Sequence, residues 1–268
     1  MIKITGYDII QNMIDFWVKQ GCIFIPSCSL PVGAATFHPI LFFNLIRNKP
    51  CNLVYLQPSI RKCDGTYGLS GNRVIVHHQL QVIMSPAPSN FHELMLENLK
   101  YIGINSDIHS ITEIDSTWES ASLGASGKGW EVRVNSLEIM QFTYFQNFGH
   151  RKIQHLTGEL AFGLERIMNA LQNKPIMECI WHDKTTYGDL FFENEKQLTK
   201  YYLEESNFQK SDFYKYMDIA KNSEPAVAYE NFILMNDIYN CLDAMNKLSY
   251  QEKKDMIKDM VSVVKSIE

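Results

Sequence analysis

Long apolar runs are missing from this sequence of 268 residues. A helix that crosses a membrane needs roughly 20 consecutive apolar residues, but the longest apolar stretch, residues 40–46, is interrupted by Asn44. The first residues also lack the long apolar segment and the small-residue cleavage site of a secretory signal. We therefore expect a cytoplasmic protein with no membrane partner.

CxxC pairs and basic clusters are missing as well. The cysteines are irregularly spaced, which argues against a zinc ribbon and a disulfide scaffold, so we expect free thiols. The chain has 25 Lys and Arg residues against 30 Asp and Glu residues, for a formal net charge of −5. A chain that binds nucleic acid alone normally carries a basic face. Any role with nucleic acid should therefore require a second polypeptide.

The standard catalytic signatures are also missing. The sequence contains no GxSxG elbow, no HExxH motif and no Walker loop. The glycine-rich run of residues 123–129 fits neither phosphate-binding spacing, and we interpret it as a flexible turn. Enzymes that depend on these signatures are therefore excluded.

What is present is a large apolar fraction, 46% of residues, arranged in strand and helix patterns. We expect helices and strands in the following ranges: helices over 7–20, 91–102 and 163–171, and strands over 53–58, 74–84, 131–134, 137–146 and 157–162. Residues 22–57 otherwise suggest short strands and loops. Beyond Pro175 the pattern is mainly helical, with a capping box at Ser249 and Glu252. This predicts an α+β domain over residues 1–174 and a helical domain over residues 175–268.

A strand that ends at a glycine and leads into a helix is the first candidate site. Alternation along residues 157–163 places Glu159, Ala161 and Gly163 on one face, and Arg166 lies in the first turn of the next helix. The free N–H groups of that turn, the helix dipole and the guanidinium could bind one anion. An ordinary surface ion pair at a helix start is the simpler alternative.

The predicted hairpin of residues 53–58 and 74–84 is the second candidate. Gln79 and Gln81 project from one face of the returning strand, and Arg61 and Arg73 lie in the connection. This face is polar where an ordinary core strand would be apolar. An edge strand with a solvated face would give the same pattern.

Taken together, these segments resemble the alpha subunit of bacterial heterotetrameric glycyl-tRNA synthetase, nearly from end to end. The resemblance is carried by Gln20-Gly21-Cys22, residues 32–39, Gln57-Pro58-Ser59, Trp118-Glu119-Ser120, residues 123–125, 129–132 and 141–146, Gly163-Leu164-Glu165-Arg166, residues 186–189 and Ala228-Tyr229-Glu230. It implies a class II aminoacyl-tRNA synthetase core, an antiparallel sheet flanked by helices, with a C-terminal helical domain. It also implies an alpha–alpha homodimer within a tetramer of two alpha and two beta chains.

The resemblance implies that the chain activates glycine with ATP, forming glycyl-adenylate and pyrophosphate, and that tRNA(Gly) binds mainly through the beta chain. Its substrates and cofactors would be ATP and Mg²⁺. The implied site consists of four groups: Arg61 and Arg166 as catalytic residues; Arg61, Arg73, Gln79 and Arg166 on ATP; Gln81, Trp118, Gln141, Thr143 and Glu159 around glycine; and Glu131 and Glu138 on the metal. Simple alternation puts Glu138 on the opposite strand face from Gln141 and Thr143. A bulge, a twist or a less direct metal role must resolve that.

Glycine requires a pocket too small for a side chain, because steric clash can exclude larger substrates. By resemblance, rigid walls such as Trp118 and Thr143 would provide this exclusion. Two departures from the family pattern favour an alternative, a non-catalytic scaffold or regulatory paralogue: Ile60 replaces one of two adjacent arginines, and residues 27–31 have lost their acidic groups. Adenylation of a different small acid is a third hypothesis.

Overall fold

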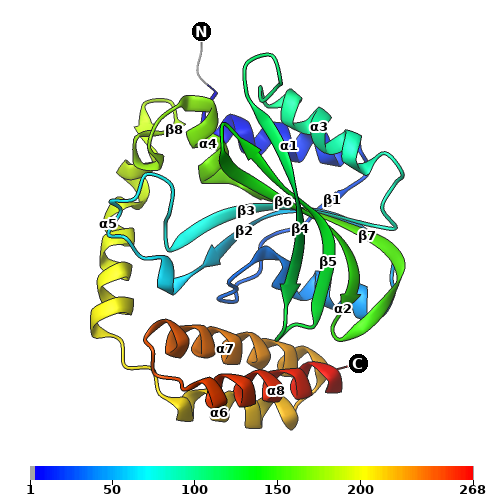
Figure 1. Ribbon diagram of the computed structural model, residues 1–268, viewed down its shortest axis with the longest axis vertical. Coiled ribbons are helices and arrows are strands. Elements are labelled where there is room, and N and C mark those ends of the chain that lie inside the picture. The colour runs from blue at the N-terminus through cyan, green and yellow to red at the C-terminus, as the bar shows by residue number, and fades with distance from the viewer. Residues whose placement is uncertain (1–3, 268) are drawn as a thin grey trace.

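One sheet organises the chain, and the computed structural model describes residues 4–267 around it (Figure 1). Its strand order is β1-β2-β3-β7-β6-β5-β4, with β1 parallel to β2 and all other neighbours antiparallel. The strands are β1 (Ile23–Phe24), β2 (Cys51–Ile60), β3 (Val76–Ser85), β4 (Ile111–Ser120), β5 (Ala125–Val134), β6 (Leu137–Phe148) and β7 (Arg151–Gly163). A small separate sheet pairs β8 (Ile180–His182) with β9 (Thr185–Thr186).

Helices cover both faces of the large sheet. They are α1 (Gly6–Lys19), α2 (Pro39–Ile46), α3 (Phe91–Tyr101), α4 (Leu164–Gln172), α5 (Tyr187–Lys200), α6 (Lys210–Lys221), α7 (Pro225–Ala244) and α8 (Tyr250–Ser266). In Figure 1, α1 and α3 lie above the sheet, and α6, α7 and α8 lie below it. The predicted α+β class is thereby confirmed.

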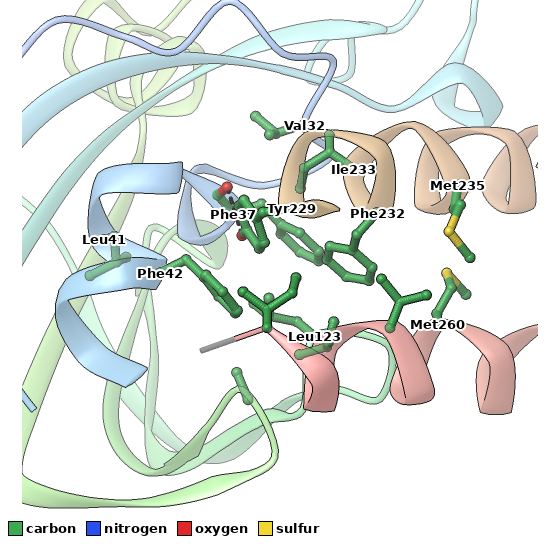
Figure 2. Close-up of a cluster of buried hydrophobic side chains, with 14 of the residues drawn as sticks. Val32, Phe37, Leu41, Phe42, Leu123, Tyr229, Phe232, Ile233, Met235 and Met260 are labelled. Carbon is green, nitrogen blue, oxygen red and sulfur yellow. Dashed lines mark hydrogen bonds between the residues drawn. The ribbon is translucent and has the colours of Figure 1, made fainter. Parts of the chain in front are cut away.

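The sheet separates two hydrophobic cores. The upper core packs α1, α3 and α4 against one face, and the lower core packs α2 and the C-terminal helices against the other. Val82 lies in the upper core and its neighbour Ile83 in the lower core, because successive side chains of a strand point to opposite faces. Figure 2 shows the lower core, in which Met235 of α7 faces Met260 of α8 and Phe232 lies next to Tyr229.

The lower face of the sheet is apolar along one half and polar along the other. Leu53 and Tyr55 of β2 pack in the lower core, whereas Gln57 and Ser59, further along the same face, are buried polar residues. Burying polar groups without partners is costly. This half of the sheet therefore satisfies them with hydrogen bonds and leaves room for a cavity.

Several local predictions are confirmed. The hairpin forms between β2 and β3, with Tyr55 opposite Gln81, and the capping box at Ser249 and Glu252 starts α8. All six cysteines are free thiols, of which Cys22, Cys179 and Cys241 are buried. The described part of the chain contains no helix that combines the length and apolar character needed to cross a membrane.

Other local predictions are wrong. Helix α2 lies within residues 22–57, where we expected only strands and loops; Pro39 opens it, and Nδ1 of His38 accepts from the N–H of Ile40. The long edge strand β4 was not predicted, because most of its residues are polar and exposed. Residues 123–129 are not a flexible turn, since Leu123 is fully buried and β5 begins at Ala125.

The glycines of β5 permit close strand approach. A Cβ at Gly129 would overlap the backbone carbonyl of Phe142 on β6, and one at Gly127 would overlap that of Tyr144. The glycine-rich run therefore reflects tight packing.

The predicted division of the chain at residue 174 stays a prediction. Tyr187 of α5 belongs to the upper core, together with Ile176 and Cys179. Helices α6, α7 and α8 instead share the lower core with the sheet. The segment beyond residue 174 thus contributes to both cores.

We expect Gly129→Ala to lower the free energy of unfolding by about 1–3 kcal/mol, because the added methyl forces β5 away from β6. Gly71→Ala is the matched control, since a Cβ there would meet no atom within 4 Å, and it should leave stability unchanged or raise it by up to about 1 kcal/mol. Urea unfolding measures both. Equal stability of the two variants would contradict the packing role of Gly129.

Candidate functional site

A cavity of about 160 Å³ opens on the polar half of the lower face. Strands β3, β6 and β7, the start of α4 and the connection between β2 and β3 contribute its walls. The predicted site residues that line it are Arg61, Arg73, Gln79, Trp118, Glu138, Gln141, Glu159 and Arg166. Residues more than 100 positions apart in the sequence thus meet at one hollow.

Three guanidinium groups converge on this cavity. Arg166 donates from Nη1 to Oε2 of Glu138 at 2.9 Å, and Nε of Arg61 donates to the carbonyl of Gly33 at 3.3 Å. Nη1 of Arg73 lies 4.0 Å from Oδ1 of Asp64 and is largely exposed. Desolvation lowers the pKa of Arg61, and the nearby charge of Arg166 acts in the same direction. Such a cluster of cations favours an anionic ligand.

An irregularity in β6 brings Glu138 to the cavity. Val132 pairs with Met140 but Arg133 pairs with Glu138, so Ile139 is an extra residue between them. Ile139 and Met140 both pack in the upper core, and the alternation breaks at this point. Glu138 and Gln141 therefore both reach the cavity, which resolves the conflict left by simple alternation.

The inner end of the cavity holds a buried carboxylate. Glu159 is 1% exposed; Oγ1 of Thr36 donates to its Oε1 at 2.7 Å, and Nε2 of Gln81 donates to the same oxygen. Burial raises the pKa of Glu159 to about 8, although both hydrogen bonds oppose the shift. A carboxyl in this setting becomes a strong partner for a small cation such as a primary ammonium group.

Gln81 and Thr143 lie beside this carboxylate but do not line the cavity. Both are fully buried, and Thr143 pairs directly with Glu159 across the strands. Oε1 of Gln81 and Oγ1 of Thr143 have no hydrogen-bond partner among the described residues. These two acceptors add to the capacity of this end for an N–H donor.

Glu131 is a third predicted site residue that does not line the cavity. Its Oε1 accepts from Nε of Arg133 at 2.5 Å, and it is not part of the cavity wall. Across the strands it pairs with Gln141, one position from the bulge. It therefore lies beside the cavity, on the same sheet face as Gln141.

The site predicted from the sequence did not include Thr36 and His77, which also line the cavity. Thr36 lies within residues 32–39, which carried the resemblance without a role for this side chain. His77 lies two residues before Gln79 on the same strand face, so one more step of alternation would have found it. Burial lowers the pKa of His77 to about 3, so its ring is neutral, and its Nε2 has no hydrogen-bond partner among the described residues.

Comparison with known proteins gives a clear family match. The family model described as "Glycyl-tRNA synthetase alpha subunit" matches residues 7–268. Two solved structures of pyrrolysyl-tRNA synthetase from Desulfitobacterium hafniense are also similar, each with 13% identity and a TM-score of 0.49. Both alignments cover 68% of this chain, and they cover 72% and 75% of the respective structures. The family match confirms the resemblance found in the sequence.

The raised pKa of Glu159 predicts a pH-dependent stability. The unfolded chain releases this proton near the ordinary value of 4.5 and the folded chain near 8, so the contribution to stability is full below pH 4.5 and is lost as the pH rises through 8. Glu159→Gln carries no titrating carboxyl and should not show this loss. Its free energy of unfolding relative to that of wild type should therefore rise by on the order of 3 kcal/mol between pH 5 and pH 8. Urea unfolding at both pH values measures the difference.

The control is Glu97→Gln, at an exposed position of α3. Its stability should follow that of wild type at both pH values. If Glu159→Gln also followed wild type, the carboxyl would not be titrating in a desolvated environment.

Proposed function

Because the chain belongs to the glycyl-tRNA synthetase alpha subunit family, we propose that it activates glycine with ATP and, with a beta subunit, charges tRNA(Gly). An aminoacyl-tRNA synthetase function follows from the family itself. The observation that supports the finer proposal is one cavity that joins three arginines to a buried glutamate. Such a cavity can hold a polyphosphate and an amino acid side by side.

The reaction explains why no protein nucleophile is needed. A carboxylate oxygen of glycine attacks the α-phosphorus of ATP and forms the new P–O bond. The bond from that phosphorus to the bridging oxygen of the β-phosphate breaks, and pyrophosphate leaves. Catalysis then consists of positioning the reactants and neutralising the phosphate charge.

The three arginines fit this task. Arg61 would contact the α-phosphate and the glycine carboxylate, Arg73 the outer phosphates, and Arg166 the rest of ATP. Oε1 of Gln79 already accepts from the N–H of Ala35 and from Oγ of Ser59, both at 2.9 Å. Its amide nitrogen is therefore the group oriented to donate to the nucleotide.

The carboxylates suit Mg²⁺, which prefers oxygen ligands and often takes one or two carboxylates together with phosphate oxygens. Glu138 lines the cavity and Glu131 lies beside it, so these two would hold the ion. Within residues 4–267, no group of three or more His, Cys, Asp and Glu side chains could hold a metal ion, which fits an ion that binds with the nucleotide. When bound, Mg²⁺ would neutralise phosphate charge.

Glycine would bind at the inner end. Its ammonium would replace the proton of Glu159, whose carboxylate Thr36 and Gln81 already hold by hydrogen bonds. Ala161 and Trp118 line the same cavity. A side chain larger than hydrogen would meet these walls, so selection for glycine would come from exclusion.

We further propose that the chain forms an alpha–alpha homodimer in a tetramer with two beta chains, in the cytoplasm. The beta chain would supply most contacts to tRNA, because the alpha chain has an excess of acidic residues and counterion release requires basic ones.

The scaffold alternative receives little support from the position of the departures. Ile60 and residues 27–31 are not part of the cavity wall. The N–H of Cys28 donates to Oε1 of Gln57 at 2.9 Å, so this segment is anchored without acidic groups. Both departures therefore leave the arginines and the glutamates of the cavity in place.

Glycine-dependent exchange of pyrophosphate into ATP tests the proposed function. We expect exchange in wild type with the beta chain, and a loss of about 10²–10³-fold in kcat/KM for Arg61→Ala, because its charge stabilises the transition state. The control is Arg47→Ala, at an exposed position after α2, which should keep wild-type exchange. Absence of exchange in wild type, with or without the beta chain, would favour the scaffold, and exchange that glycine fails to stimulate would indicate another acid.

Thr143→Ala tests the amino-acid end. Thr143 pairs with Glu159 and does not line the cavity itself, so its truncation would let the Glu159 side chain recede. The enlarged pocket should then admit one more methyl, and alanine activation relative to glycine should rise by about 10-fold or more. The exposed Thr117, next to Trp118 on β4, provides the control Thr117→Ala. Unchanged preference for glycine over alanine in Thr143→Ala would refute this pocket.

A further inference from the structure

Tyr229 of α7 connects the C-terminal helices to a turn beside the cavity. Its side chain is fully buried, its ring stacks on Phe42 at a centroid distance of 3.9 Å, and its hydroxyl donates to the carbonyl of Phe37 at 3.0 Å. Figure 2 shows Tyr229 next to Phe37 and Phe42. The cavity is not lined by Tyr229 itself.

A second tyrosine holds the same turn from the sheet. The turn spans Ala35–Phe37, and the hydroxyl of Tyr55 donates to the carbonyl of Ala35 at 2.9 Å. The carbonyls of Ala35 and Phe37, the residues on either side of Thr36, thus each accept a hydrogen bond from a fully buried tyrosine hydroxyl. Buried rings have few alternative rotamers in a close-packed core, so these hydroxyls are fixed in space.

Thr36 is the residue between the two anchored carbonyls, and its hydroxyl donates to Glu159 at 2.7 Å. A displacement of the turn would move this hydroxyl away from the carboxylate. Tyr229 is therefore linked to Glu159 through Phe37 and Thr36, although 192 positions separate Tyr229 from Phe37 in the sequence.

We propose that Tyr229 is a positioning residue for the amino-acid end of the site, and that it acts by fixing the turn that holds Thr36 against Glu159. This inference rests on the proposed function, since it assigns Glu159 to the substrate ammonium. It gives α7 a part in substrate selection. The Ala228-Tyr229-Glu230 motif of the sequence thereby gains a function.

The test is Tyr229→Phe, which removes only the hydroxyl, assayed by pyrophosphate exchange in the full chain with the beta subunit. We expect the KM for glycine to rise about 3- to 10-fold, as for loss of one buried hydrogen bond, with the KM for ATP unchanged. Tyr55→Phe should give the same split. Tyr216→Phe, a partly buried tyrosine packed against the same lower core, is the control and should keep both wild-type values.

A double-mutant cycle separates positioning from general destabilisation. In a Thr36→Val background, Tyr229→Phe should cause no further rise in the KM for glycine, because the route through Thr36 is already broken. Additive effects, or equal rises in the KM for glycine and for ATP, would overturn the proposal.

Amide hydrogen exchange gives a readout that needs no activity. Residues 34–38 should exchange faster in Tyr229→Phe than in wild type, with no change in Tyr216→Phe. Unchanged protection of this turn would refute the positioning role even if the wild-type chain proved inactive. If the wild type were inactive but Tyr229→Phe still exchanged faster at residues 34–38, the proposed function would be wrong. The link between Tyr229 and the turn would nevertheless be confirmed.

Discussion

A carboxylate buried in the middle of a sheet is the constraint on which the site depends. Glu159 lies on β7, the central strand, and is almost entirely removed from water. Burial of an unpaired charge is costly, so the carboxyl retains its proton to an unusually high pH or requires a cation beside it. Thr36 and Gln81 satisfy part of its hydrogen-bonding capacity. The hydrogen-bonding capacity of Glu159 that remains unfilled is what supports the proposal that an ammonium group binds there.

The rest of the site follows from how the sheet is covered. The C-terminal helices and α2 occupy only the apolar half of the lower face, and the polar half remains open as a cavity. Antiparallel pairing brings the hairpin arginines, the first turn of α4 and the β6 bulge to the rim of that cavity. Guanidinium groups and a buried carboxylate therefore lie next to each other in one cavity, which is the arrangement that the proposed joining of ATP and glycine requires.

Much of the site could be predicted from the local pattern of side chains along the strands. Alternation correctly placed Glu159, Ala161 and Gly163 on one face, and it placed Gln79 beside them. The same rule failed at Glu138, because an extra residue in β6 reverses the faces and leaves no local signal. It also failed for residues 123–129, where glycines that suggested flexibility serve close strand packing.

The sequence by itself determined the capping box of α8, the hairpin, the faces of β3 and β7 and, through its separated motifs, the family. These properties depend on neighbouring residues or on ordered patterns along the chain. Only the tertiary structure decided that Arg61 and Arg166 share one cavity, that Gln81 and Thr143 are buried beside Glu159, and that Tyr229 donates to the turn of Thr36. Those relations depend on contacts between residues far apart in the chain, and such contacts form only when the sheet and the helices pack together.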